Sequence, residues 1–364
     1  PGTANFGAMR FCGRPVDRAA ALGARKDSEA LRQLAESNSA RFLVVHTRRI
    51  LASKSSLVWL SRGAVDNLVQ AGHTHNLEPI YLGPLSESFS AVGVPRRAAA
   101  FAVDLALLSV PEEKVLAASE GSQWRSGRDL LVSEASDDEV TVAGIALALA
   151  DWHQSARYEG RTGMLTVPVE GGAKRQVEGG SAKVYPRTDP VAIGLILSPD
   201  GRRCLLGRSH KYPAGMYTCL SGFIDSCESV EEAFKREAFE EAGVRLATVS
   251  LCASQPWPIG RGGSCELMLG CKAVAASEDI VVNRDEIEDA RWFSKQEVQQ
   301  MLQQKHPDKL WVPPRFAIAN QLINDFVTPS RQLPSRGGTM PVIAASVALG
   351  LLAGFAISRV RPRL

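Results

Sequence analysis

The most constraining feature of this sequence is a spaced set of charged residues and glycines between positions 222 and 243. The set comprises Gly222, Glu228, Arg236, Glu237, Glu240, Glu241 and Gly243. In a helix that advances about 100° per residue, the last three glutamates share an arc of roughly 100°. Such carboxylates repel each other by about 0.2–0.5 kcal/mol per pair. A solvated surface helix tolerates this repulsion, whereas a bound Mg²⁺ ion would reverse it, because Mg²⁺ takes carboxylate oxygens as ligands.

The residues between these charges predict a helix over residues 228–242 with one buried side. Val230 and Phe234 fall on an arc beside the carboxylates, and Gly243 is suited to end the helix. Residues 191–197 form a near-continuous apolar run, which is typical of a strand covered on both faces. Further strands are predicted at residues 203–208, 216–221, 267–274 and 290–293, and further helices at residues 295–303 and 316–327.

The first 150 residues alternate short apolar runs with polar breaks, which predicts a separate mixed domain. Its expected strands are residues 42–46, 57–60, 79–82 and 99–105, and its expected helices are residues 28–36 and 141–157. The longer helix is apolar on one side, where Val142, Ile145 and Leu149 recur at a helical period. A glycine-rich stretch, residues 159–183, follows and indicates either a loop-rich linker or a small subdomain.

Composition excludes several classes of protein. Apolar residues make up 45% of the 364 residues and charged residues 22%, so the chain is not mainly disordered and can form packed cores. The 42 basic and 39 acidic residues leave a net charge of +3, which gives no overall electrostatic footprint for nucleic acid. The seven cysteines form no C-x-x-C pair, which indicates reduced thiols instead of a disulfide framework or a zinc finger.

The whole spacing, Gly-x5-Glu-x7-Arg-Glu-x-x-Glu-Glu-x-Gly-Val, resembles the Nudix box, the loop–helix signature of the Nudix hydrolases. Ala238 departs from this pattern, because the family usually has a bulky aliphatic residue at that packing position. We therefore expect weaker docking of the helix there. The resemblance implies an α+β fold in which a Nudix α/β/α sandwich domain follows an α+β N-terminal domain.

A second motif narrows the resemblance to the NADH pyrophosphatase branch of the family, which is also similar to hydrolases of NAD-capped RNA. Residues 254–258, Ser-Gln-Pro-Trp-Pro, are similar to the specificity loop of that branch. Trp257 offers an aromatic face for a base or ribose, and the prolines pre-set its orientation. Ile259 replaces the usual Phe, and residues 260–266 contain an insertion, so we expect weaker or broader recognition of the base. Other short segments resemble the branch more weakly, but they follow one another in the same order along the chain. These segments are residues 11–18, 40–43, 149–153, 185–190, 286–293 and 313–323.

The zinc ribbon of that branch has lost its ligands in this sequence. The branch carries two C-x-x-C knuckles, but Glu159, Thr162, Val177 and Gly180 stand at those positions. A tetrahedral zinc site needs four nitrogen or sulfur ligands, so we expect no structural zinc. The expected parts of the chain are an N-terminal domain at 1–148, the degenerate ribbon at 149–186, the Nudix domain at 187–328, a linker at 329–339 and a hydrophobic segment at 340–357.

The resemblance implies hydrolysis of the diphosphate bridge of NADH or NAD to nicotinamide mononucleotide and AMP, with Mg²⁺ or Mn²⁺. Glu241 is expected to orient or deprotonate the attacking water beside Glu240, and Arg236 to brace the carboxylates. The expected metal ligands are the Ser221 carbonyl and the carboxylates of Glu237, Glu240, Glu241 and Glu286. The expected substrate contacts are Tyr185, Gln255, Pro256, Trp257, Pro258, Ser264 and Ala319. The resemblance also implies a homodimer.

Two other functions stay open at this point. The first is the action of a related Nudix hydrolase on another substrate, such as the NAD cap of RNA. RNA binding would need a basic path outside the pocket, and the pairs at residues 96–97 and 174–175 are too sparse to indicate one. The second is a non-catalytic nucleotide-binding module. The intact acidic residues argue against such a module, because a domain without catalysis does not require a cluster of carboxylates that repel each other.

Residues 340–357 predict a transmembrane tail anchor. The segment has no charged residue, and as a helix it would be about 27 Å long, close to the roughly 30 Å core of a bilayer. Arg336 flanks one side, and Arg359, Arg361 and Arg363 flank the other. We therefore expect a membrane-anchored enzyme at the peroxisome or, second, at the mitochondrial outer membrane. The alternatives are a packed helix or an unstructured tail of a cytoplasmic protein.

Overall fold

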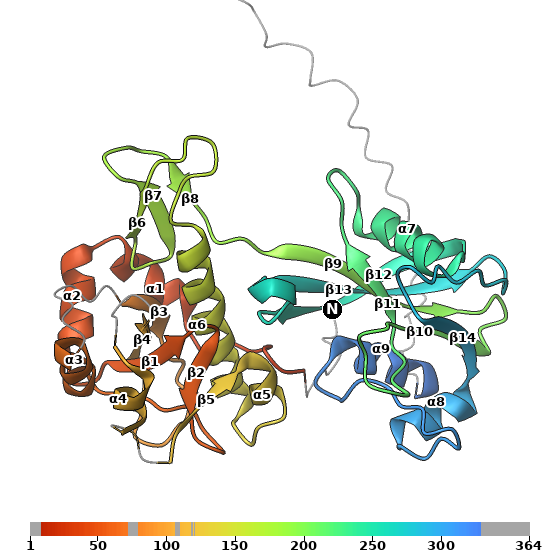
Figure 1. Cartoon of the computed structure of the whole chain (residues 1–364), viewed down its shortest axis with the longest axis horizontal. Coiled ribbons are helices and arrows are strands. Elements are labelled where there is room, and N and C mark those ends of the chain that lie inside the picture. The colour runs from red at the N-terminus through yellow and green to blue at the C-terminus, as the bar shows by residue number, and fades with distance from the viewer. Residues whose placement is uncertain (1–8, 72–78, 106–109, 118, 120, 329–364) are drawn as a thin grey trace, which may run out of the picture. The chain divides into compact units, whose positions relative to one another are not determined.

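The computed structural model describes residues 9–71, 79–105, 110–117, 119 and 121–328 of the chain (Figure 1). Within these residues the strands form two larger sheets and a small one. Each sheet is built from its own stretch of sequence, in chain order. The mixed α and β content agrees with the predicted fold class.

The first sheet has the strand order β3-β4-β1-β2-β5, with β1 and β4 parallel and the other neighbours antiparallel. Its strands are β1 (Arg41–His46), β2 (Arg49–Ala52), β3 (Ile80–Pro84), β4 (Ala99–Asp104) and β5 (Gln123–Ser126). The helices of this part are α1 (Arg18–Arg25), α2 (Ser28–Glu36), α3 (Arg62–Ala71), α4 (Glu112–Ala117), α5 (Gly127–Leu131) and α6 (Asp137–Ser155). Residues 57–60, predicted as a strand, form only isolated bridges.

Both faces of this sheet are buried, which explains the apolar run in β1. Phe42 and Val44 belong to a core cluster that includes residues of α1, α2 and α3. Leu43 and Val45 belong to a second cluster that includes residues of α6. Successive side chains of a strand point to opposite faces, so a strand covered on both sides needs apolar residues throughout.

Helix α6 is buried on more sides than the sequence predicts. Ala143 and Leu147 are buried, whereas Ile145 and Leu149, which were expected on the apolar side, are only half-buried. The helix therefore packs against neighbours on several sides, and a single-face pattern describes it poorly.

The glycine-rich stretch after α6 forms a small subdomain instead of a loop-rich linker. It contains an antiparallel sheet of β6 (Thr166–Val169), β7 (Lys174–Val177) and β8 (Lys183–Val184). These strands are short, and the surrounding glycines give a stronger turn signal than the strands give a strand signal. The sequence therefore predicts either a linker or a small subdomain, and it does not predict where the strands lie.

Hydrogen bonds within the chain close the turns at residues 159–162 and 177–180, where the resemblance predicts the degenerate knuckles. The Glu159 carboxylate accepts hydrogen bonds from the backbone N–H of Arg161 and from the N–H and hydroxyl of Thr162, at 2.8–3.1 Å. At the second position the Gly180 N–H donates to the Val177 carbonyl at 3.0 Å. Each turn is therefore closed by hydrogen bonds of the chain itself.

A buried polar network joins the small sheet to α6. Arg175 donates to His153 Nδ1 at 2.9 Å, and also to the hydroxyl and the carbonyl of Thr166 at 2.7 and 2.6 Å. Because a guanidinium only donates, Nδ1 is the acceptor, and His153 Nε2 donates to the Gly172 carbonyl at 2.8 Å. Burial, with the positive charge of Arg175 nearby, lowers the pKa of His153 to about 4. The ring is therefore neutral at physiological pH.

The second large sheet has the strand order β12-β13-β9-β10-β14, and β11 also pairs with β9. Its strands are β9 (Asp189–Leu197), β10 (Arg203–Arg208), β11 (Leu220–Phe223), β12 (Leu246–Trp257), β13 (Glu266–Ala275) and β14 (Asp289–Ser294). Strands β9 and β13 are parallel, and the other pairs are antiparallel. The helices are α7 (Val230–Ala242), the short 3-10 helix η2 (Arg261–Gly263), α8 (Lys295–Leu302) and α9 (Ile318–Val327).

Helices cover both faces of this sheet and form a sandwich. Ile193 and Leu195 of β9 belong to a cluster with α8 and α9, whereas Ala192 and Ile196 belong to a cluster with α7. Ala238, the residue that departs from the family pattern, is completely buried in the α7 cluster. The near-continuous apolar run in β9 therefore has the physical cause that the sequence predicts.

The prediction of a transmembrane helix is corrected by the structure. Across the residues that it describes, no helix is both long and apolar enough to cross a bilayer. The predicted segment, residues 340–357, lies outside the described residues, as does the linker before it. Membrane anchoring at the peroxisome or the mitochondrion depended on that helix and has no support in the described part of the chain.

We expect the purified protein to contain no stoichiometric zinc and to keep its melting temperature in a zinc chelator. The physical reason is that hydrogen bonds of the chain already close both knuckle turns. Elemental analysis, together with thermal unfolding in the presence and absence of chelator, would check this. One tightly bound zinc per chain would contradict the prediction.

We also expect His153 to make the protein less stable as the pH falls from about 6.5 to about 4. The unfolded chain takes up a proton at this histidine over that interval, whereas the folded chain does not, so protonation favours unfolding. The shift corresponds to about 3 kcal/mol of unfolding free energy lost across the interval. Denaturant unfolding at several pH values should show a flatter dependence in His153→Gln than in the parent. His210→Gln, at an exposed histidine, is the control and should keep the parent slope.

Candidate active site

The candidate site lies where β11 ends and α7 begins. Ser229 caps the helix, because its hydroxyl accepts from the Glu232 N–H at 3.2 Å and the Glu232 carboxylate accepts from the Ser229 N–H at 2.9 Å. Gly243 ends the helix with a φ of 69°, a left-handed conformation that glycine adopts without strain. The two caps fix where the glutamate-bearing helix starts and stops.

Gly222 allows β11 and α7 to approach closely. A Cβ atom at this position would lie 1.9 Å from Cδ of Glu237, which is closer than two such atoms can come. The position therefore requires glycine for space. Because Gly222 has no side chain, the Glu237 carboxylate lies directly against β11.

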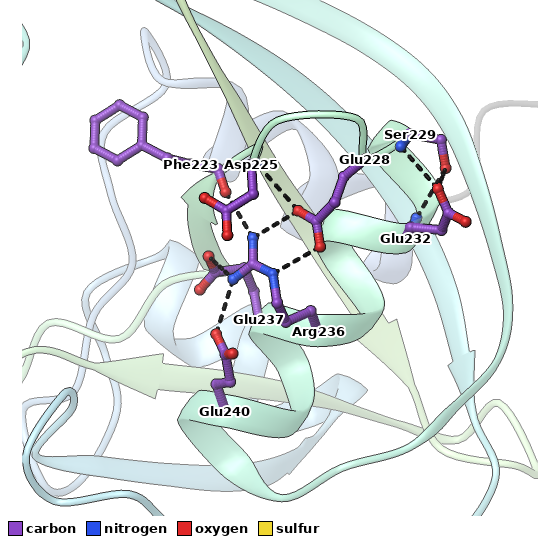
Figure 2. A network of polar contacts seen from close by, with 8 residues as sticks. All are labelled: Phe223, Asp225, Glu228, Ser229, Glu232, Arg236, Glu237 and Glu240. Carbon is purple, nitrogen blue, oxygen red and sulfur yellow. Dashed lines mark hydrogen bonds and ion pairs between the residues drawn. The ribbon is translucent and has the colours of Figure 1, made fainter.

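Arg236 is the centre of the polar network in Figure 2. Its Nε and Nη2 donate to the two carboxylate oxygens of Glu228 at 2.8 and 2.9 Å. Its Nη1 donates both to Glu237 and to Glu240 at 2.8 Å, and Nη2 also donates to the Phe223 carbonyl at 2.9 Å. One guanidinium thus ties the loop before α7 to two of the predicted metal ligands, which supports its predicted bracing role.

The network shifts the pKa values of its members in opposite directions. The hydrogen bonds from Arg236, and then that from the Asp225 N–H, lower the pKa of Glu228 to about 2. Burial raises the pKa of Glu237, which is only 9% exposed, and the charges of Glu240 and Glu286 raise it further, although Arg236 opposes this. Burial of Glu237 thus disfavours the charged form of its carboxylate.

The loop before β14 brings Glu286 toward α7. The Asn283 N–H donates to the Glu241 carbonyl at 3.0 Å, and the Asn283 amide donates to the Glu286 carboxylate at 3.2 Å. Asn283 therefore orients Glu286 from the C-terminal end of the helix. Ser221, the predicted carbonyl ligand, lies in β11 opposite Ile193 of β9.

These oxygen donors have the chemistry that a divalent cation needs. Among the described residues, no group of three or more acidic, histidine or cysteine side chains is yet arranged to hold a metal ion. The contact between Glu237 and Glu240 runs instead through Nη1 of Arg236.

The predicted substrate residues differ in exposure. Tyr185 is exposed, and Nζ of Lys174 lies 5.5 Å from the centroid of its ring. Ser264 donates to Glu266 at 2.9 Å. Pro256 is exposed, and the next two residues of the specificity loop are half-buried.

Gln255 and Ala319 are buried, with exposed fractions of 0% and 4%. Their side chains therefore face the interior in the described structure, although the resemblance implies substrate contact for both. Sequence reasoning also missed the backbone groups of Phe223 and Asp225, which bind Arg236 and Glu228. Both residues lie between Gly222 and Glu228, and this position in the sequence is the signal that could have located them.

Comparison with known proteins agrees with this geometry. The model of the NUDIX domain family matches residues 188–313. The mouse protein "NAD(P)H pyrophosphatase NUDT13, mitochondrial" is 34% identical over 244 residues, which cover 62% of this chain and 67% of that protein. This chain belongs to the Nudix family.

Further relatives place this Nudix protein in the NADH pyrophosphatase branch. The human "NAD-capped RNA hydrolase NUDT12" is 40% identical over 199 residues, which cover 52% of this chain and 42% of that protein. A protein of Pseudomonas syringae pv. tomato, "NAD-capped RNA hydrolase NudC", is 36% identical over 174 residues, 48% of this chain and 60% of that protein. The matched part thus spans less than half the length of the human relative.

We expect Glu241→Gln to abolish catalysis by this Nudix domain while leaving it folded. Glutamine keeps the volume of the side chain but loses its charge, and the loss in turnover should be at least roughly 10²-fold. Steady-state kinetics and thermal unfolding would measure the two effects. Glu231→Gln makes the same change on the same helix outside the spaced set, and it should keep parent activity. Equal activity of the two variants would contradict the assignment of Glu241.

Proposed function

We propose that this protein hydrolyses the diphosphate bond of NADH or NAD and releases nicotinamide mononucleotide and AMP, with Mg²⁺ or Mn²⁺ bound. The observation that carries the proposal is the bracing of Glu237 and Glu240 by Arg236 at the junction of β11 and α7. The names of the NADH pyrophosphatase relatives support a dinucleotide as the substrate.

The proposed chemistry relies on positioning and charge, as hydrolysis of phosphate anhydrides does in general. A divalent ion bound by the α7 carboxylates would neutralise charge on the diphosphate oxygens and acidify a water molecule. Glu241 would orient the attacking water or take its proton. Arg236 holds the carboxylates in place through Glu228 and the Phe223 carbonyl, so their spacing is set before substrate arrives.

The proposed recognition of the dinucleotide depends on aromatic surfaces. Trp257 offers one face of an indole to a base or ribose, and exposed Tyr185 offers another ring. The choice between NADH and NAD, the choice between Mg²⁺ and Mn²⁺, and the homodimer stay predictions.

A second candidate function is removal of the NAD cap from RNA. Two relatives at 40% and 36% identity carry that activity in their names. The scissile diphosphate is the same group in a free dinucleotide and in the cap, so one set of carboxylates serves both substrates.

Incubation of the protein with NADH, NAD or ADP-ribose, each with Mg²⁺ or Mn²⁺, tests the proposal through release of AMP measured by chromatography. We expect AMP from the dinucleotides, and none from them in the Glu241→Gln variant. A parallel incubation with NAD-capped RNA tests the second candidate. Binding of NADH without any release of AMP would overturn the proposal and indicate a non-catalytic module.

A further inference from the structure

Gln255 uses its buried side-chain amide to join three separate segments. Its Nε2 donates to the Arg10 carbonyl at 3.0 Å and to the Phe316 carbonyl at 2.8 Å. Its Oε1 accepts from the Ile318 N–H at 2.7 Å. Helix α9 starts after Ala317, which provides no side-chain cap, so Gln255 supplies the partner that the first turn needs. The specificity loop is thereby fixed to α9 and to the segment before the first sheet.

Trp257 packs against the N-terminal part of the chain. Its ring meets Phe11 edge to face, with centroids 6.1 Å apart and an angle of 86° between the planes. Phe11 is only 3% exposed and has a φ of 61°, in the left-handed region. A bulky residue keeps this backbone conformation only where the surrounding packing enforces it. Trp257 is thus in contact with a residue from outside the matched Nudix domain, residues 188–313.

Two glycines let helices of the N-terminal domain come close to the specificity loop. A Cβ atom on Gly144 of α6 would lie 2.8 Å from Cγ of Pro258 and 2.7 Å from a ring carbon of Phe11. A Cβ atom on Gly127 of α5 would lie 2.2 Å from Cγ2 of Ile259. Neither glycine has a positive φ, and glycine is otherwise unfavourable within a helix. The close approach of the loop is therefore the physical reason for both glycines.

The insertion after the specificity loop is seated on the same domain. A Cβ atom on Gly263 would lie 2.4 Å from the guanidinium carbon of Arg48, in the turn between β1 and β2. Arg48 in turn donates to the Asp151 carboxylate of α6 at 2.5 Å. Gly263, within the insertion, thus lies close to the Arg48 side chain of the N-terminal domain.

We propose that the N-terminal domain positions the specificity loop and thereby sets the affinity of the site for its dinucleotide. This inference rests on the proposed function. Gly127, Gly144 and Phe11 act as positioning residues through Trp257, Pro258 and Ile259. The catalytic carboxylates are held by a different set of contacts, those of Arg236 and Glu228, so the two properties are separable.

The test is a double-mutant cycle between Gly127 and Ile259 in the full chain, with KM and kcat measured on NADH. Gly127→Ala should raise KM about tenfold or more, because small misplacements of positioning groups have effects of up to about 10²-fold, and kcat should change much less. In the Ile259→Ala background the same substitution should leave KM nearly unchanged, because the atom that it would meet is gone. Gly63→Ala, in α3, is the matched control, because its added Cβ meets no atom within 4 Å.

Each outcome decides between the proposals. An unchanged KM in folded Gly127→Ala, or the same rise in KM in both backgrounds, overturns the positioning role. If Gly127→Ala does not fold, Ile259→Ala alone must raise KM, and parent KM in that variant overturns the inference. A parent protein that hydrolyses NADH while these results fail refutes only the inference. A parent that binds NADH without releasing AMP refutes the proposed function, and the dissociation constants of the same variants then test the positioning role.

Discussion

The guanidinium of Arg236 is the interaction on which the candidate site depends. Without a cation, the glutamates on one side of α7 repel each other, and Glu237 is buried as well. Arg236 offsets this charge at the helix and, through Glu228, fixes the loop that connects β11 to α7. The bonds to Glu228 are the main reason that the pKa of Arg236 lies well above its usual range, so its guanidinium is charged at physiological pH.

The packing of α7 follows from the same requirement. The helix must bring a carboxylate against a strand, and two glycines provide the space. Gly222 leaves space for Glu237, and Gly194 of β9 leaves space for the ring of Phe234, which would lie 2.3 Å from an added Cβ. The sheet therefore has glycine at two positions, and the space so left is filled by the Glu237 carboxylate and the Phe234 ring. Residues that are unfavourable for a strand, such as these glycines, are expected where a fold must also build a functional site.

Local signals predict the elements with a clear period, such as α7, but they miss others, among them the helices α1 and α3 and the long strand β12. The helix predicted over residues 228–242 is α7, Val230–Ala242, because periodicity and caps are encoded locally. The parallel pairing of β9 with β13 has no local signal, since the packing of the whole domain decides it. In the site, charge spacing predicts the role of Arg236. The burial of Gln255 could not be predicted, because its partners Arg10 and Phe316 are far away in sequence.

Helix α6 contacts both the small sheet of β6, β7 and β8 and the specificity loop. Near its C-terminal end, His153 binds Arg175 and Gly172 and so holds the small sheet. About two and a half turns earlier, Gly144 lies close to Pro258. A helix with contacts on several sides needs apolar or small residues around its whole circumference, and the buried residues of α6 have that distribution. The weak amphipathic pattern of this helix is therefore the consequence of its position between the small sheet, the first large sheet and the specificity loop.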